Sequence, residues 1–276
     1  MRELRLDASD LRPYELGCRI DGIDLSCHRL QEDADVYLDG RLVAVLRKNR
    51  IDNGRWKFLR SDFNTPVLTS DRRKTASNGR RELVRSGVLG YIDHLTPQMK
   101  KELGVGEGAR MTAFCRHFPE RWTRFLPLVR DVDRLYRQTC PRHYAVQKSA
   151  AQRARLTIED TVFSTITVNQ NWQSGVHTDS GDFVGGMSCL VILGGGYRGG
   201  WLVLPRLGVV LKTEPGDIVF MDAHEPHGNT PIEPRAPDAL RMSLIFYLRE
   251  KIHRYHKKIH DAKGQVFHVI SSSSRP

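Results

Sequence analysis

The chain lacks the features that mark membrane proteins, secreted proteins and domains stabilised by structural zinc. Its 276 residues contain no apolar run close to the ~20 residues that a membrane-spanning helix needs. The opening residues Met1–Gly17 have no apolar region of the kind found in secretory signals. The 5 cysteines are scattered and form no C-x-x-C pair, which argues against a disulfide framework and a structural zinc site. We therefore expect a soluble, intracellular protein with no membrane partner.

Acidic residues are fewer than basic ones, 32 against 43, and the net charge is +11. A basic excess favours polyanionic partners because each phosphate contact releases counterions; the alternative is simply a basic soluble protein. Part of the charge lies in residues 71–94, which form either a solvated loop or a loop that contacts phosphates. The candidate phosphate ligands in this loop are Arg72, Arg73, Lys74, Arg80 and Arg81.

The pattern along the chain predicts one main domain with two additions. We expect residues 1–70 to form an N-terminal extension packed on the core, with a β-hairpin turning at Asp39-Gly40. Residues 71–250 form the main domain. Residues 251–276 are expected to be a basic C-terminal tail with a frayed end.

The main domain begins with helices and continues with strands. Apolar residues at helical spacing predict helices over 121–137 and 143–155. Short β-rich runs separated by Gly, Pro and Asp then predict an antiparallel sandwich or jelly roll. The fold class is thus mainly β with flanking helices (α+β). The six strand candidates are residues 163–168, 187–193, 201–204, 209–212, 218–221 and 242–247.

Two glycine clusters, 194–196 and 199–200, look at first like a phosphate-binding loop. No Gly-Lys-Ser/Thr follows them, and no strand-to-helix context of a dinucleotide fold surrounds them. We interpret them as a hairpin between two strands.

His177 and Asp179 are the first candidate metal ligands. In a locally extended backbone, residues i and i+2 project to the same side, so both can reach one ion. The third ligand must come from a distant strand, where His224 and His227 compete. We favour His227, because Pro226 before it favours an extended or turn backbone. Two histidines and one carboxylate leave adjacent positions open on a metal, as in non-haem Fe(II) oxygenases.

Arg241 and Ser243 are candidates for holding a keto-acid co-substrate. The run from Arg241 to Tyr247 alternates as a strand does, which puts Arg241 and Ser243 on one face. A guanidinium can grip a carboxylate with two parallel bonds, and a serine hydroxyl on the same face can add another. The alternative for a buried strand arginine is a structural ion pair.

Several of these motifs together resemble one branch of the Fe(II)/2-oxoglutarate dioxygenases, the branch that contains the base-J-binding proteins and the ten-eleven translocation (TET) enzymes. The resemblance covers roughly residues 75–250. It is carried by Thr167-Val-Asn-Gln-Asn-Trp172, His177-x-Asp179, Gly199-Gly200, Gly216-Asp217, His227-Gly-Asn-Thr-Pro231 and Arg241-Met-Ser243.

The resemblance implies a double-stranded β-helix core, with His177, Asp179 and His227 as catalytic iron ligands and Arg241 as the residue that holds 2-oxoglutarate. It implies hydroxylation of the 5-methyl group of thymine or 5-methylcytosine in DNA, with O2 as co-substrate. A methyl group inside a duplex cannot reach buried iron, so the base must flip out. We expect a monomer.

The resemblance also suggests base contacts. Tyr247 matches an aromatic that stacks on the flipped base, and Arg249 stands where the methylcytosine enzymes place a histidine. Asp182 stands where they use an asparagine; an ionised carboxylate can accept N3–H of thymine or N4–H of cytosine. Asn169 and Asn171 complete the candidate set, and their sequence context is closer to the thymine branch.

Two other hypotheses remain. The same chemistry could act on a free nucleobase, a small metabolite or a protein side chain, with the basic charge incidental. Alternatively, the chain is a non-catalytic nucleic-acid-binding module with a vestigial metal site. The intact set of two histidines, one aspartate and one arginine argues against the second of these.

Overall fold

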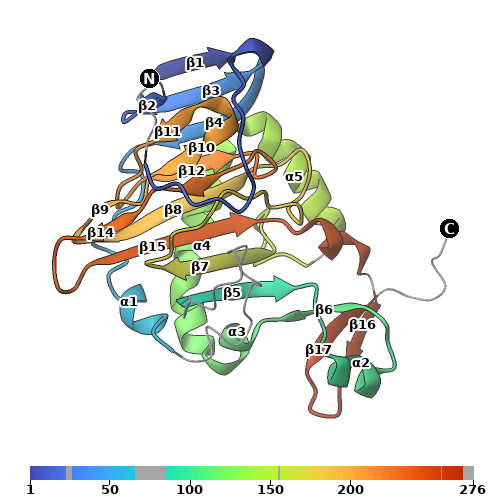
Figure 1. Cartoon of the computed structure of the whole chain (residues 1–276). Coiled ribbons are helices and arrows are strands. Elements are labelled where there is room, and N and C mark those ends of the chain that lie inside the picture. Colours follow the sequence, from blue (N-terminus) through green and yellow to red (C-terminus); the bar gives the residue numbers. More distant parts are fainter. Residues whose placement is uncertain (23–26, 66–84, 155, 256, 270–276) are drawn as a thin grey trace.

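The computed structural model describes residues 1–22, 27–65, 85–154, 156–255 and 257–269 (Figure 1). None of the helices in these ranges combines the length and apolar character that crossing a lipid bilayer requires. The predicted phosphate ligands between Arg72 and Arg81 lie outside the described residues.

Two long helices confirm the helical prediction. Helix α4 spans Pro119–Thr139 and α5 spans Pro141–Ala154, and both begin with a proline. Proline suits the first helical turn because its missing N–H would have no partner there. The shorter helices are α1 (Leu59–Asp62), α2 (Pro97–Leu103), α3 (Ala113–His117) and the 3-10 turns η1 (Ala8–Asp10), η3 (Pro205–Leu207) and η4 (Glu250–Arg254).

A large sheet of 11 described strands forms the centre of the molecule, in the order β1-β3-β4-β12-β8-β15-β7-β5-β6-β17-β16. Most neighbouring strands are antiparallel, including β8, β15 and β7. The strand bounds are β1 (Arg2–Leu6), β3 (Ala34–Leu38), β4 (Arg41–Arg47), β5 (Arg85–Ile92), β6 (Gly108–Met111), β7 (Thr165–Gln170), β8 (Ser188–Gly195), β12 (Ile218–Met221), β15 (Leu240–Tyr247), β16 (Lys257–His260) and β17 (Val266–Val269).

Two smaller sheets complete the β structure. One has four strands in the order β13-β10-β11-β2, and we call it the minor sheet to distinguish it from the 11-stranded main sheet. The other pairs β14 with β9. Their strands are β2 (His28–Leu30), β9 (Tyr197–Gly199), β10 (Leu202–Leu204), β11 (Val209–Leu211), β13 (Gly228–Asn229) and β14 (Ile232–Pro234).

The central strands bury both faces, and their side chains alternate between two cores. On β8, Cys189 and Val191 belong to the core that includes α4, whereas Leu190 and Ile192 belong to the core shared with the minor sheet. This period of two is the ordinary geometry of a strand. The result is three layers, with helices, the main sheet and the minor sheet in succession (Figure 1).

Helix α4 is held on the sheet by an aromatic and aliphatic stripe. Phe125, Val129, Val132 and Tyr136 are each 0% exposed. Burying side chains of this size contributes about 1.5–3 kcal/mol each relative to leaving them in water. These contacts fix the helical layer against the face of the sheet opposite the minor sheet.

The predicted fold class, a mainly β jelly roll with flanking helices, is confirmed. The predicted hairpin is also present, as β3 and β4 joined by Asp39 and Gly40 with φ of 49° and 75°. Positive φ at both central residues is what a two-residue hairpin turn of the right twist requires. This hairpin belongs to the main sheet, since β4 pairs with β12.

Three local expectations differ from the structure. Arg85 begins strand β5 rather than continuing the basic loop, because β5 pairs with β7. Residues 257–260 and 266–269 form β16 and β17, and β17 pairs with β6, so this part of the chain is not a free tail. Gly194 and Gly195 end β8, and Gly196 leads to β9, which belongs to a different sheet, so these glycines do not close a hairpin between paired strands.

Candidate metal centre

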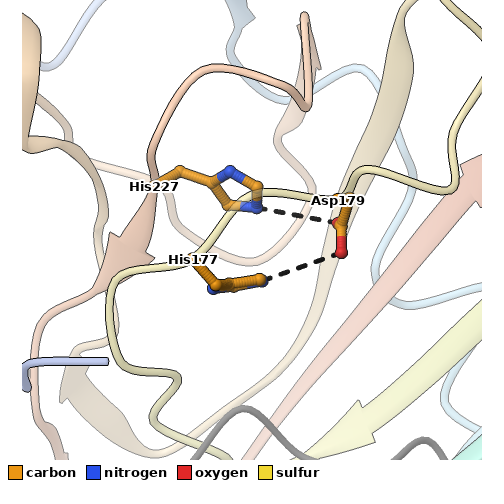
Figure 2. Close-up of side chains that lie close together, drawn as sticks. All are labelled: His177, Asp179 and His227. Carbon is orange, nitrogen blue, oxygen red and sulfur yellow. Dashed lines mark ion pairs between the residues drawn. The ribbon is translucent and has the colours of Figure 1, made fainter. Parts of the chain in front are cut away.

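Two histidines and one aspartate converge on a single point between the main and minor sheets. His177, Asp179 and His227 offer ligand atoms that all lie within 4.8 Å of one another. Asp179 Oδ1 lies 3.9 Å from His177 Nε2, and Asp179 Oδ2 lies 3.7 Å from His227 Nε2 (Figure 2). This is the residue set expected for a non-haem ferrous ion.

Backbone hydrogen bonds bring the distant ligands together. His177 and His227 form an isolated antiparallel bridge, in which the N–H of each donates to the carbonyl of the other at 2.9 Å. Asp179 is anchored to the same segment, because its N–H donates to the Ala223 carbonyl at 2.9 Å. The three side chains are therefore positioned by main-chain contacts.

Each histidine ring is oriented by its second nitrogen. His177 Nδ1 lies 2.9 Å from the Gly175 carbonyl, and His227 Nδ1 lies 2.9 Å from the Glu225 carbonyl. A carbonyl oxygen can only accept, so both Nδ1 atoms carry the proton. Each Nε2 is then left with a lone pair on the side that faces Asp179, which is the tautomer a metal ligand needs.

His224, the competing candidate, faces elsewhere. Its Nδ1 lies 3.0 Å from Asp222 Oδ1, and its side chain is 32% exposed. Burial acts to raise the pKa of Asp222, but hydrogen bonds from Arg41 and His224 outweigh it and the pKa is lowered. His224 thus belongs to a surface cluster outside the group of three.

The three ligands line one cavity of about 250 Å³. Pockets for drug-sized ligands usually span about 300–1,000 Å³, so this volume suits a small co-substrate. Four apolar side chains form part of its wall: Leu190, Leu202, Met221 and Ile245.

Arg241 enters the same cavity from β15 and is 3% exposed. Burial lowers the pKa of Arg241 because it disfavours the charged form. Among the described residues no carboxylate pairs with its guanidinium, and its buried Nε has no hydrogen-bond partner. A structural ion pair is thus not what holds Arg241. A buried cation with an unused Nε–H donor fits a carboxylate ligand such as one end of 2-oxoglutarate.

Glycine at position 200 leaves the space that the Arg241 side chain occupies. Gly200 has φ of 68°, and a Cβ atom there would lie 2.5 Å from both Cδ and Nε of Arg241. A glycine at position 200 therefore leaves room for the Arg241 side chain beside the cavity.

Ser243 and Asn169 also line the cavity, from the adjacent strands β15 and β7. Ser243 shares the Arg241 face, as the alternation predicts. Asn169 Oδ1 accepts a hydrogen bond from the Ser86 hydroxyl at 2.6 Å. These two positions are open to a bound molecule.

The other four base-contact candidates are not among the described residues that line this cavity. The exposed Asn171 bonds to the β15 backbone: its Oδ1 accepts from Arg241 N–H at 2.7 Å. Asp182 is buried, and its carboxylate accepts from the Ser188 hydroxyl at 2.5 Å. Ser188 itself does line the cavity, so Asp182 lies one side chain behind the wall.

Tyr247 is buried and the nearby Arg249 is half-buried. Tyr247 is 2% exposed, and its hydroxyl lies 3.2 Å from that of Thr167. Arg249 Nε lies 2.6 Å from Asp93 Oδ1. Arg249 also meets Asp182 across an isolated backbone bridge.

Sequence reasoning missed several cavity residues. Ser86, Trp172, Ser174 and Asn229 line the wall. Asn229 lies inside the quoted His227-Gly-Asn-Thr-Pro motif, which could have marked it. Ser86 carries no such signal, because it reaches the site only through the pairing of β5 with β7.

A family model describes residues 98–250 as Tet_JBP, the oxygenase domain of the 2OGFeDO superfamily. The chain belongs to the Tet_JBP family. The match covers more than half of the chain and includes all three metal-ligand candidates and Arg241. The superfamily's cofactors are Fe(II) and 2-oxoglutarate, and the residues described above fit both.

Named relatives of this Tet_JBP chain are much longer proteins. It is 32% identical over 213 residues to the bifunctional helicase and thymine dioxygenase JBP2 of Trypanosoma brucei brucei, a match that spans 76% of this chain and 19% of the relative. It is 28% identical over 215 residues to the thymine dioxygenase JBP1 of Crithidia fasciculata, spanning 77% of this chain and 25% of the relative. The chain thus spans a quarter or less of either relative.

A solved structure shares the Tet_JBP fold. The structure of NgTET1 in complex with 5mC DNA superposes with a TM-score of 0.55, covers 83% of each chain and is 14% identical in sequence. At this identity the likeness shows the fold alone.

Proposed function

We propose that the chain is an Fe(II)- and 2-oxoglutarate-dependent dioxygenase that hydroxylates the 5-methyl group of thymine or 5-methylcytosine in DNA. One observation supports the proposal most strongly. His177, Asp179 and His227 meet in a cavity that is also lined by Arg241, a buried arginine whose guanidinium has no carboxylate partner among the described residues. The thymine dioxygenase names of the relatives support the choice of a DNA methylpyrimidine as substrate.

The proposed site residues have two tasks: some bind the metal and 2-oxoglutarate, and others exclude water. His177, Asp179 and His227 would hold the ferrous ion, and Arg241 with Ser243 would hold 2-oxoglutarate through its far carboxylate. When bound, the metal and the keto acid supply the reductive activation of O2, coupled to loss of CO2 from the keto acid. The apolar side chains of the wall would keep bulk water from the site, which protects a reactive centre from side reactions.

Base recognition is proposed for Asn169, Asn171, Asp182, Tyr247 and Arg249, and phosphate binding for Arg72, Arg73, Lys74, Arg80 and Arg81. Stacking on Tyr247 would contribute about 1–3 kcal/mol. It also requires the ring, 2% exposed without DNA, to become accessible when the base enters. We propose that the protein acts as a monomer, since one chain supplies the metal ligands and Arg241.

The proposed function is tested by measuring whether methylated DNA increases the rate at which the protein converts 2-oxoglutarate to succinate. Succinate formation is measured with iron and 2-oxoglutarate alone, with methylated oligonucleotides, and with the same oligonucleotides unmethylated. The proposal predicts that methylated DNA raises the rate above the uncoupled level. No stimulation by DNA, with stimulation by a free nucleobase or a metabolite, would favour the alternative substrate class.

A further inference from the structure

The turn from Asp222 to His227 contains one metal-ligand candidate, His227, and contacts the other two. The Ala223 carbonyl holds the N–H of Asp179, and the Glu225 carbonyl holds Nδ1 of His227, both at 2.9 Å. His227 in turn is bridged to His177 by two backbone hydrogen bonds. A displacement of this turn would therefore shift every ligand at once.

An ion pair fixes this turn from the minor-sheet side. The Glu225 side chain is 1% exposed, and its carboxylate is gripped by two nitrogens of Arg206, with Nε to Oε1 at 2.8 Å. Arg206 lies in η3, between β10 and β11. The pair thus ties the ligand turn to a different structural element.

The two-bond contact between Arg206 and Glu225 explains why this ion pair can fix the orientation of Glu225. A planar guanidinium with two bonds to one carboxylate allows little rotation, unlike a single contact. Burying the charges is costly, and such pairs often add little net stability, so their value can lie in fixing one geometry. Here the fixed geometry includes the carbonyl that orients the His227 ring.

We propose that Glu225 and Arg206 are a positioning pair for the metal centre. Their ion pair holds the Glu225 carbonyl where it accepts from His227 Nδ1, and so keeps Nε2 directed at the metal. The inference rests on the proposed metal centre, and it is independent of which substrate is oxidised.

Three variants of the full chain test the pair: Glu225→Gln, Arg206→Gln and the double substitution. The affinity of each apo protein for Co(II), a stable replacement for Fe(II), is measured by calorimetry, and the visible ligand-field bands of bound Co(II) are recorded. Each single variant is expected to lose about 10–100-fold in affinity, as is typical for residues that orient metal ligands, and to shift the bands. The double variant should lose no more than either single one, because the two residues act as a unit.

Arg130→Gln is the matched control. Arg130 also makes two bonds to one carboxylate, that of Glu159, at 2.8 and 2.9 Å, and neither residue belongs to the turn that holds the metal ligands. Its loss should leave Co(II) affinity unchanged. Arg206, whose side chain is 27% exposed, is the more accessible member of the pair, so Arg206→Gln decides the question if Glu225→Gln does not fold.

The results distinguish failure of the positioning role from failure of the metal centre itself. Lower thermal stability of the apo variants with unchanged Co(II) affinity and unchanged bands would overturn the positioning role, since only structure would then be affected. Failure of the unsubstituted protein to bind Co(II) would instead contradict the metal centre and the proposed function with it.

Discussion

His177 and His227, fifty residues apart in the chain, are joined by a reciprocal pair of backbone hydrogen bonds of 2.9 Å. The bridge places their rings 4.4 Å apart between centroids and directs both Nε2 atoms toward Asp179. Since the backbone carries the convergence, the ligand side chains can be replaced with little effect on the surrounding sheets. That property makes the site suitable for single substitutions.

His227→Gln and His224→Gln form a matched pair of substitutions in one turn. Removing His227 should reduce Co(II) affinity by at least about 100-fold, because one of three protein ligands is lost. Removing His224 should leave affinity within about threefold, because its ring faces Asp222. Calorimetric titration of both variants checks this; a larger loss for His224→Gln would reverse the choice of ligand.

Arg241→Lys should weaken 2-oxoglutarate binding while leaving the metal site intact. Lysine keeps the charge but cannot present a planar fork to a carboxylate. A lost charge-assisted hydrogen bond costs about 1.5–3 kcal/mol, which corresponds to about 10–100-fold in affinity. Titration of the Co(II)-loaded protein with 2-oxoglutarate measures the effect. Unchanged 2-oxoglutarate affinity would show that Arg241 has a purely structural role.

Gly200→Ala should produce the same loss of 2-oxoglutarate affinity without touching any ligand group. The added Cβ would lie 2.5 Å from Cδ and Nε of Arg241, so the guanidinium must move. The positive φ of 68° adds a strain of about 1–2 kcal/mol, which should lower the melting temperature. Gly264→Ala is the control, because Gly264 has φ of 73° with open space around it. It should lose stability but keep 2-oxoglutarate affinity.

Buried thiols should make the protein sensitive to alkali. Burial raises the pKa of Cys140 from 9.0 to about 12. In the unfolded chain this thiol ionises near its ordinary pKa of 9.0, while in the folded protein it stays neutral, so its contribution to stability is complete below pH 9.0 and is lost as the pH rises toward 12. Between pH 9 and about 10.5 the loss should be about 2 kcal/mol.

Cys140→Ala tests this pH dependence. The variant should be less stable near neutral pH, because a buried side chain is shortened, but its stability should fall less steeply above pH 9. Urea unfolding at about pH 8 and about pH 10.5 compares the two proteins. Parallel slopes for the variant and the unsubstituted chain would show that Cys140 contributes nothing to the alkaline loss.

Local patterns predicted much of this architecture. The Asp39-Gly40 turn, the helical stripe of α4 and the alternation of β15 are each set within a few neighbouring residues, and each is present. Even so, α4 also buries Leu128 and Tyr136, which are not in the stripe that helical spacing predicts, namely Trp122, Phe125, Leu126, Val129, Val132 and Leu135. Which flank of an amphipathic helix is most buried depends on the sheet it covers.

Contacts between distant segments could not be predicted. The pairing of β5 with β7 brings Ser86 to the cavity, and the ion pair to Glu225 comes from Arg206 in η3, between β10 and β11. Neither follows from spacing along the chain. The same reason applies to Tyr247: its face of the strand was predictable, but its burial against Thr167 is decided by the neighbouring strand.

Mass analysis of nucleosides shows whether the protein hydroxylates a methylpyrimidine in DNA. The iron-loaded protein is incubated with 2-oxoglutarate and with methylated or unmethylated DNA, the DNA is digested, and the nucleosides are weighed. We predict a thymidine or 5-methyldeoxycytidine product heavier by one oxygen atom, formed by the unsubstituted protein and absent with His177→Ala. Succinate formation with every nucleoside mass unchanged would contradict it.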